Sequence, residues 1–240
     1  MTTQTQKPDI THHLTDETLA AYATGSLSEA FEVVVASHLT LCSDCRERAS
    51  FLDSVGGYFV EHSESVKPSL TASEMLTKCR LMEVVQFDNS SDRTDGRKQE
   101  QPGASNSGDG AHGQVPLPLA RRLPDSVDNL PWKPLARGVE QFELGTGNKQ
   151  DGVFKLLRIQ PGTQLIEHEH GDHEMTLVLH GSYVDSLGRF SAGDVADLGP
   201  EHTHKPVIDS DEPCIALIAS NAPARYKGIV GRIIQPFVDI

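Results

Sequence analysis

A long polar stretch divides this chain into two parts of different character, and it restricts the fold to separate domains. Between Asn89 and Gln114 almost every residue is Ser, Asp, Gly, Gln, Asn, Arg or Lys, and no aliphatic side chain is larger than alanine. Such a stretch buries too little apolar surface to offset the entropy that is lost on ordering. We therefore predict a flexible linker over 86–116, between one domain at 1–85 and another at 117–240.

Helical spacing dominates the first part of the chain. Thr15 is a good cap for a first helix, and Gly25 follows the end of that helix. Ser26 and Glu29 match the capping-box pattern of a second helix, which runs to about Leu41. The spacing therefore predicts two short helices joined by a tight turn.

Two further helices are expected before the polar stretch. The third runs from about Asp44 to Gly56, and Thr71 with Glu74 forms a capping box at the start of the fourth. The apolar residues of this fourth helix have helical spacing: Met75, Leu76, Cys79 and Met82. Such a stripe fits core packing in a helical bundle, and it equally fits docking on a partner.

A first set of candidate metal ligands lies in the helical part. His38, Cys42 and Cys45 have the spacing H-x3-C-x2-C, and positions four apart share one face of a helix. Two thiolates and an imidazole supply three ligands of a tetrahedral zinc site, and a closed structural site needs a fourth. His13 is the natural candidate, with His12 as the fallback. The alternative is a buried histidine beside two free thiols.

A second set lies in the C-terminal part, where Gly and Pro punctuate short runs of β type. His168 and His170 are two residues apart, so on a strand they face the same side. We expect a hairpin to bring Glu174 back over them, and the fourth ligand to be His202 or His204. Three imidazoles and a carboxylate suit Zn, Fe, Mn, Ni or Cu, whereas the alternative is a set of surface histidines on solvated turns.

The segment HHLTDETLAAYATGSLSEAFEVVVASHLTLCSDCRERASFLDSVGG, residues 12–57, resembles the zinc-binding anti-sigma domain. It is most similar to the ChrR-type anti-sigma factors, which carry a cupin domain behind the zinc domain. The resemblance implies a structural zinc held by His13, His38, Cys42 and Cys45. It also implies a helical domain that wedges between the two conserved domains of an extracytoplasmic-function sigma factor and hides the surfaces that RNA polymerase would use.

The run GTQLIEHEHGDHEMTLVLHG resembles the first motif of the cupins, G-x5-H-x-H-x3,4-E-x6-G, at every defining position. The second motif is approximate, because the spacing from Pro200 to the last histidine departs from the usual one. The resemblance favours His204 as the last ligand, beside His168, His170 and Glu174, for Zn2+ or another divalent metal. It implies a jelly-roll β-barrel, so the predicted fold is multidomain α plus β.

Charge and hydropathy exclude some classes of function. The chain has 34 acidic and 21 basic residues, a net charge of −13, which disfavours binding to duplex DNA. A zinc-dependent DNA-binding regulator is therefore the weakest hypothesis. No apolar run reaches the roughly 18 residues that span a bilayer, and residues 1–9 lack the apolar core of a signal peptide. We expect a cytoplasmic protein without a membrane partner.

The predicted function is that of a cytoplasmic anti-sigma factor rather than an enzyme. It would sequester an extracytoplasmic-function sigma factor in a 1:1 complex and release it on an oxidative signal, which the resemblance implies to be singlet oxygen. The alternative is a metal-dependent cupin oxidoreductase or isomerase with an accessory zinc domain, which would need an open coordination position. Cys79 has no spaced partner and is interpreted as a small core residue, and Cys214 as a buried thiol rather than a redox sensor.

Overall fold

The computed structural model describes residues 9–64, 71, 73–77, 115–145, 152–169, 171–221 and 225–226. The chain forms two compact units, one of Met1–Gly57 with Gly108–Ile240 and the other of Tyr58–Ser107. Of the predicted linker, only residues 115 and 116 are among those described. No helix in the described ranges is long and apolar enough to cross a membrane.

The first helix, α1 (Asp16–Ala23), begins and ends as its sequence predicts. The Thr15 hydroxyl oxygen accepts a hydrogen bond from the Thr18 N–H at 3.2 Å. At the other end Gly25 has a φ of 64°, and its N–H donates to Tyr22 while the Ser26 N–H donates to Ala21. This pair of bonds is a Schellman motif, which glycine favours because it lacks a Cβ.

The second helix, α2 (Glu29–Leu41), begins later than the predicted capping box requires. Its N-cap is Ser28, so the capping-box prediction for Ser26 with Glu29 is wrong. The physical reason is that Ser26 belongs to the end of α1, where its hydroxyl donates to the Ala21 carbonyl at 3.1 Å. Because the Ser26 hydroxyl bonds to a carbonyl at the end of α1, it does not cap the start of α2.

The third helix, α3 (Ser43–His62), is longer than predicted, because Gly56 and Gly57 lie inside it. Beyond it, in the second unit, residues 73–77 are helical. The predicted capping box there is confirmed: the Thr71 hydroxyl bonds to the Glu74 carboxylate at 2.7 Å and accepts from the Glu74 N–H at 3.3 Å. Cys79 and Met82 of the predicted stripe lie outside the described residues.

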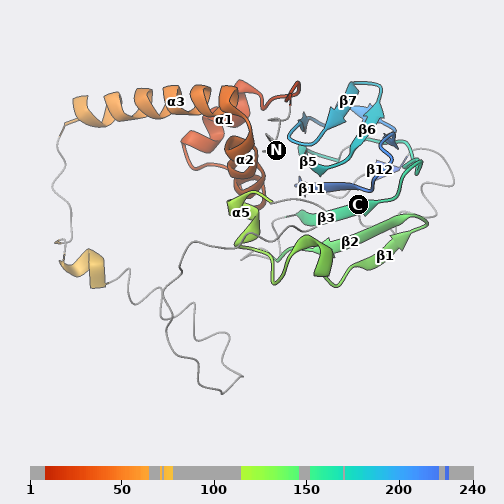
Figure 1. Cartoon of the computed structure of the whole chain (residues 1–240). Coiled ribbons are helices and arrows are strands. Elements are labelled where there is room, and N and C mark those ends of the chain that lie inside the picture. Colours follow the sequence, from red (N-terminus) through yellow and green to blue (C-terminus); the bar gives the residue numbers. More distant parts are fainter. Residues whose placement is uncertain are drawn as a thin grey trace, which may run out of the picture. The chain divides into compact units, whose positions relative to one another are not determined.

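The C-terminal part is built of antiparallel sheets, drawn green to blue in Figure 1. A six-stranded sheet has the order β1-β2-β3-β11-β5-β8, and two three-stranded sheets have the orders β10-β6-β7 and β12-β4-β9. The strands of the first sheet are β1 (Lys133–Ala136), β2 (Val139–Glu143), β3 (Val153–Ile159), β11 (Cys214–Ser220), β5 (Glu174–His180) and β8 (Val195–Leu198). Those of the others are β6 (Ser182–Asp185), β7 (Gly188–Ser191), β10 (Val207–Ile208), β4 (His168–Glu169), β9 (Thr203–His204) and β12 (Arg225–Tyr226).

Strand β11 shows how the helices and sheets share one core. All seven of its residues are buried, because both of its faces are covered. Ile215, Leu217 and Ala219 face the apolar cluster that contains α2 and the short helix α5 (Leu117–Ala120). Cys214 and Ile218 face the interior between the sheets. Helix α2 therefore packs directly on β11 and β5 (Figure 1), and the α plus β architecture is confirmed.

Candidate metal centres

The N-terminal cluster consists of His13, His38, Cys42 and Cys45, whose ligand atoms all lie within 4.8 Å of one another. His13 precedes α1, His38 lies in the last turn of α2, Cys42 caps that helix, and Cys45 lies in the first turn of α3. His38 and both cysteines are buried, whereas His13 is half-buried. The chain thus brings two thiols and two imidazoles together from the segment before α1, the end of α2 and the start of α3.

His13 lies close to both thiols of this cluster. The Nδ1 atom of His13 lies 3.3 Å from Cys42 Sγ and 3.7 Å from Cys45 Sγ. The Cys45 N–H also donates to Cys42 Sγ at 3.4 Å, a bond that stabilises a thiolate. Burial raises the pKa of the Cys45 thiol to about 11, so binding of a divalent cation there would release a proton.

His38 has the protonation that a metal ligand needs. Its Nδ1–H donates to the Gly193 carbonyl at 3.0 Å, which assigns the free lone pair to Nε2. That Nε2 is buried and has no hydrogen-bond partner within the described ranges. Burial also lowers the pKa of His38 to about 4, so the imidazole is neutral at physiological pH. An orphaned, neutral nitrogen beside two thiols fits a tetrahedral zinc site.

His12, the fallback ligand, points elsewhere. Its ring stacks on Phe190 with centroids 3.9 Å apart, and its Nδ1 lies 3.1 Å from the Thr11 hydroxyl. Neither contact belongs to the cluster of four, so the geometry selects His13.

The second cluster consists of His168, Glu174 and His204, whose ligand atoms also lie within 4.8 Å of one another. All three side chains are buried. The expected hairpin is wrong, because β4 carries His168 in one sheet while β5 carries Glu174 in another. His168 instead lies opposite His204 in the β4–β9 pair, and Glu174 faces them from the six-stranded sheet.

The hydrogen bonds of the two imidazoles assign their tautomers. His168 Nδ1–H donates to the Ile166 carbonyl at 2.9 Å, and His204 Nδ1–H donates to Asp185 at 2.8 Å. The two Nε2 atoms face each other at 3.0 Å. Two imidazole nitrogens and a carboxylate oxygen that converge in this way are donors that a divalent metal accepts, so the residues fit such an ion.

His170 and His202 are the two remaining candidate ligands of the second cluster. His170 lies outside the described residues, so its role stays a prediction. His202 is turned away from the cluster: its Nδ1 lies 3.3 Å from the Gly199 carbonyl and 3.0 Å from Glu201. Of the two histidines that the sequence left open, the structure brings His204 to the cluster.

Comparison with known proteins agrees with both halves of this arrangement. Residues 123–223 match the model of the ChrR cupin-like domain. The Anti-sigma-E factor ChrR of Cereibacter sphaeroides is 37% identical over 232 residues, which cover 96% of this chain and 99% of that protein. The chain belongs to the ChrR family of anti-sigma factors. A crystal structure of Rhodobacter sphaeroides SigE in complex with the anti-sigma ChrR matches with a TM-score of 0.66 and 34% identity, covering 88% of this chain and 99% of that one.

In this ChrR family member the interior beside the second cluster is small and mostly apolar. A cavity of about 40 Å³ is lined by all three residues of the cluster and by apolar neighbours that include Leu157, Ile208 and Ile218. Sites for drug-sized ligands measure roughly 300–1,000 Å³. The cavity that the described residues line is therefore much smaller than such a site.

Three features of the two centres were not predicted from the sequence. Asp185 accepts from His204, the Gly193 carbonyl accepts from His38, and Arg48 donates to the Leu14 carbonyl at 3.0 Å, next to His13. Of these residues, only Gly193 was marked in the sequence, because Gly193-Asp194 belongs to the approximate second cupin motif. Nothing local in the chain indicates its contact with a histidine 155 residues away.

Cys214 is expected to resist thiol reagents in the folded chain. Burial raises its pKa to about 12, so the thiolate fraction at pH 8 is on the order of 10⁻⁴. Alkylation by iodoacetamide, followed by peptide mass spectrometry, should be at least about a hundredfold slower than in the urea-denatured chain. Rapid labelling of the folded chain would contradict the buried position of this thiol.

Proposed function

We propose that this protein is a zinc-dependent anti-sigma factor that sequesters an extracytoplasmic-function sigma factor in a 1:1 complex. The observation that carries the proposal is the match over nearly the whole chain to the anti-sigma factor ChrR. A ChrR protein has been crystallised in complex with the sigma factor SigE. Because the family consists of anti-sigma factors, the chain is a regulator rather than an enzyme. Its site of action would be the cytoplasm, where RNA polymerase recruits sigma factors.

Within this proposal residues 1–85 inhibit and residues 117–240 sense, joined by a linker over 86–116. Zinc in the N-terminal cluster would be structural, since a helical domain of this size buries little apolar surface of its own. The ligands would be His13, His38, Cys42 and Cys45, a set of sulfur and nitrogen donors that zinc favours. Such a metal fixes three helices relative to one another.

The second metal would be held in the cupin half by His168, Glu174 and His204, with His170 as the fourth ligand. A mixed nitrogen and oxygen set accepts Zn2+ and several other divalent metals. We propose that an oxidative signal, singlet oxygen by resemblance, acts on this half and favours the sigma-free state. Only a signal with different effects on the two states can shift the balance between them.

Helix α3 offers an apolar surface for the sigma factor. Phe51 is 68% exposed and Val55, one turn later, is 38% exposed. A hollow of about 480 Å³ lies beside Phe51, between α3 and Asp16 of α1. Adjacent large apolar side chains in water commonly mark an interface with another protein.

A capture experiment tests the partner and its surface together. The immobilised full-length chain, incubated with host lysate, should retain one sigma factor in stoichiometric amount, identified by mass spectrometry. With that purified sigma factor, Phe51→Glu should weaken binding in calorimetry by about a hundredfold or more, because a charge is buried at a hot-spot position.

Leu187→Glu is the matched control, since Leu187 is also exposed but lies in the turn between β6 and β7. We expect its affinity for the sigma factor to equal that of the unchanged chain. If the Phe51 variant bound the sigma factor as tightly as the unchanged chain does, α3 would not be part of the interface. Retention of no sigma factor by the full-length chain would overturn the proposed function itself.

A further inference from the structure

One short segment of the cupin half, the turn and strand from Ser191 to Leu198, contacts the ligand His38 and the chain on both sides of His13. Within it the Gly193 carbonyl accepts the Nδ1–H of His38 at 3.0 Å. A hydrogen bond of this kind fixes the ring orientation and tautomer of a metal-binding histidine and makes it a stronger ligand. The outer partner of an N-terminal ligand thus belongs to the C-terminal half.

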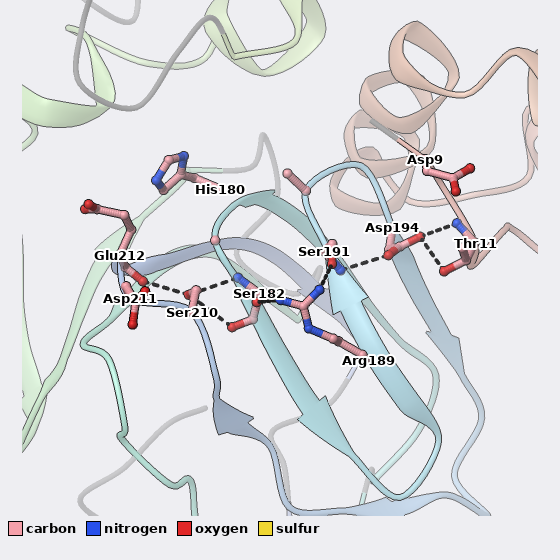
Figure 2. A pocket seen from close by; sticks show the side chains of 12 residues that line it. Asp9, Thr11, His180, Ser182, Arg189, Ser191, Asp194, Ser210, Asp211 and Glu212 are labelled. Carbon is pink, nitrogen blue, oxygen red and sulfur yellow. Dashed lines mark hydrogen bonds between the residues drawn. The ribbon is translucent and has the colours of Figure 1, made fainter. Parts of the chain in front are cut away.

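Asp194 holds the chain next to the first ligand. One carboxylate oxygen accepts from the backbone N–H groups of Thr11 at 2.7 Å and His12 at 2.8 Å, and the other accepts from the Ser191 N–H at 2.8 Å. Figure 2 shows Asp194 between Thr11 and Ser191, with interactions to both. The Asp194 side chain is only 2% exposed, and the residue after His12 is the ligand His13.

Asp197 repeats this arrangement on the other side of His13. Its Oδ2 accepts from the Thr15 N–H at 3.0 Å and from the Thr15 hydroxyl at 3.1 Å, at the start of α1. Its Oδ1 lies 2.5 Å from Nε2 of His173, the residue before Glu174 of the second cluster. His173 also stacks on Phe31 of α2, with centroids 5.1 Å apart. Asp197 therefore connects the neighbourhoods of both clusters.

We propose that Gly193, Asp194 and Asp197 are positioning residues for the zinc site, so that the cupin half sets how tightly the N-terminal half holds its metal. Two of the four ligands are involved: His38 through its ring nitrogen, and His13 through the backbone on either side. The inference rests on the proposed zinc site. A structural change at β5, where Glu174 lies, would then reach the start of α1 through the contacts of His173 with Asp197 and of Asp197 with Thr15.

Asp194→Asn tests this in the full-length chain. Both oxygens of Asp194 accept from N–H groups, so an amide must turn its NH₂ toward a donor in either orientation. Asp209→Asn is the matched control, because the Asp209 carboxylate accepts hydrogen bonds from Ser182 and Arg189, which both belong to the barrel. It makes the same change in charge and leaves the N-terminal segment untouched.

The readout is the rate of metal release from cobalt-substituted protein. Co2+ bound by thiolates has a charge-transfer absorption that a nitrogen and oxygen site lacks, so the band reports the cysteine cluster alone. On addition of excess EDTA, the band of the Asp194 variant should decay at least about tenfold faster than that of the unchanged chain and of the Asp209 variant. Decay at the rate of the Asp209 variant would overturn the proposal.

A second variant, Gly193→Ala, tests the contact with His38 independently of the Asp194 carboxylate. Gly193 has a φ of 97°, which disfavours a Cβ, so Gly193→Ala should displace the carbonyl that His38 uses without any change in charge. We expect it too to release cobalt faster than the Asp209 variant, while the β-sheet signal in circular dichroism shows that the barrel is still folded. Unchanged decay in both variants would overturn the inference alone, whereas absence of the band from the unchanged chain would overturn the zinc site as well.

Discussion

Replacing His38 by alanine should remove zinc from the N-terminal half and abolish sequestration of the sigma factor. The change deletes a buried ligand whose Nε2 has no other partner in the described part of the chain. Structural zinc contributes roughly 10–16 kcal/mol in zinc-finger peptides, more than the whole stability of many small domains, about 5–15 kcal/mol. We therefore expect residues 1–85 to unfold rather than to loosen.

The measurements for this variant are zinc content, helical circular dichroism and sigma-dependent transcription. Zinc should fall by one equivalent, helical signal should decrease, and transcription should be as high as without the protein. His12→Ala is the control, because His12 stacks on Phe190 outside the cluster and should keep the metal and sequestration. Retained sequestration by a zinc-free His38 variant would show that the metal is not structural.

Glu174→Gln should leave basal sequestration intact and abolish release of the sigma factor on photosensitised singlet oxygen. Glutamine keeps the size of the side chain but removes the anionic ligand of the second cluster. Loss of the carboxylate should reduce affinity for the cupin metal by at least about tenfold. The hydrogen bonds that hold His38 and Thr15 do not involve the Glu174 side chain, so the N-terminal half should remain assembled.

Metal content and sigma-dependent transcription before and after illumination measure this second effect. Glu201→Gln is the matched control: its side chain is 69% exposed, lies outside the cluster, and should support normal induction. If the Glu174 variant instead released the sigma factor without any signal, the division between an inhibitory half and a sensing half would be wrong.

The candidate ligands differ in how visible they are from the sequence. His38, Cys42 and Cys45 are close in the chain, so helical geometry alone brings them together. His13 and His204 each had a nearby histidine as an alternative, and the structure shows where those alternatives lie: His12 stacks on Phe190, and His202 contacts Gly199 and Glu201. The two members of each pair have the same chemistry, and their sequence neighbourhood does not say which ring faces the cluster.

Local patterns predicted both ends of α1, the capping box of Thr71 and the spacing of His38, Cys42 and Cys45, because caps and helical offsets act within a few residues. The tertiary structure alone decided how distant groups meet. Ser26 was used by α1 instead of α2, and Glu174 reached the histidines across the sheets instead of through a hairpin. The contacts of Gly193 and Asp194 with the N-terminal segment span more than 150 residues. Such contacts depend on how complete surfaces fit together, a property that no short segment of sequence contains.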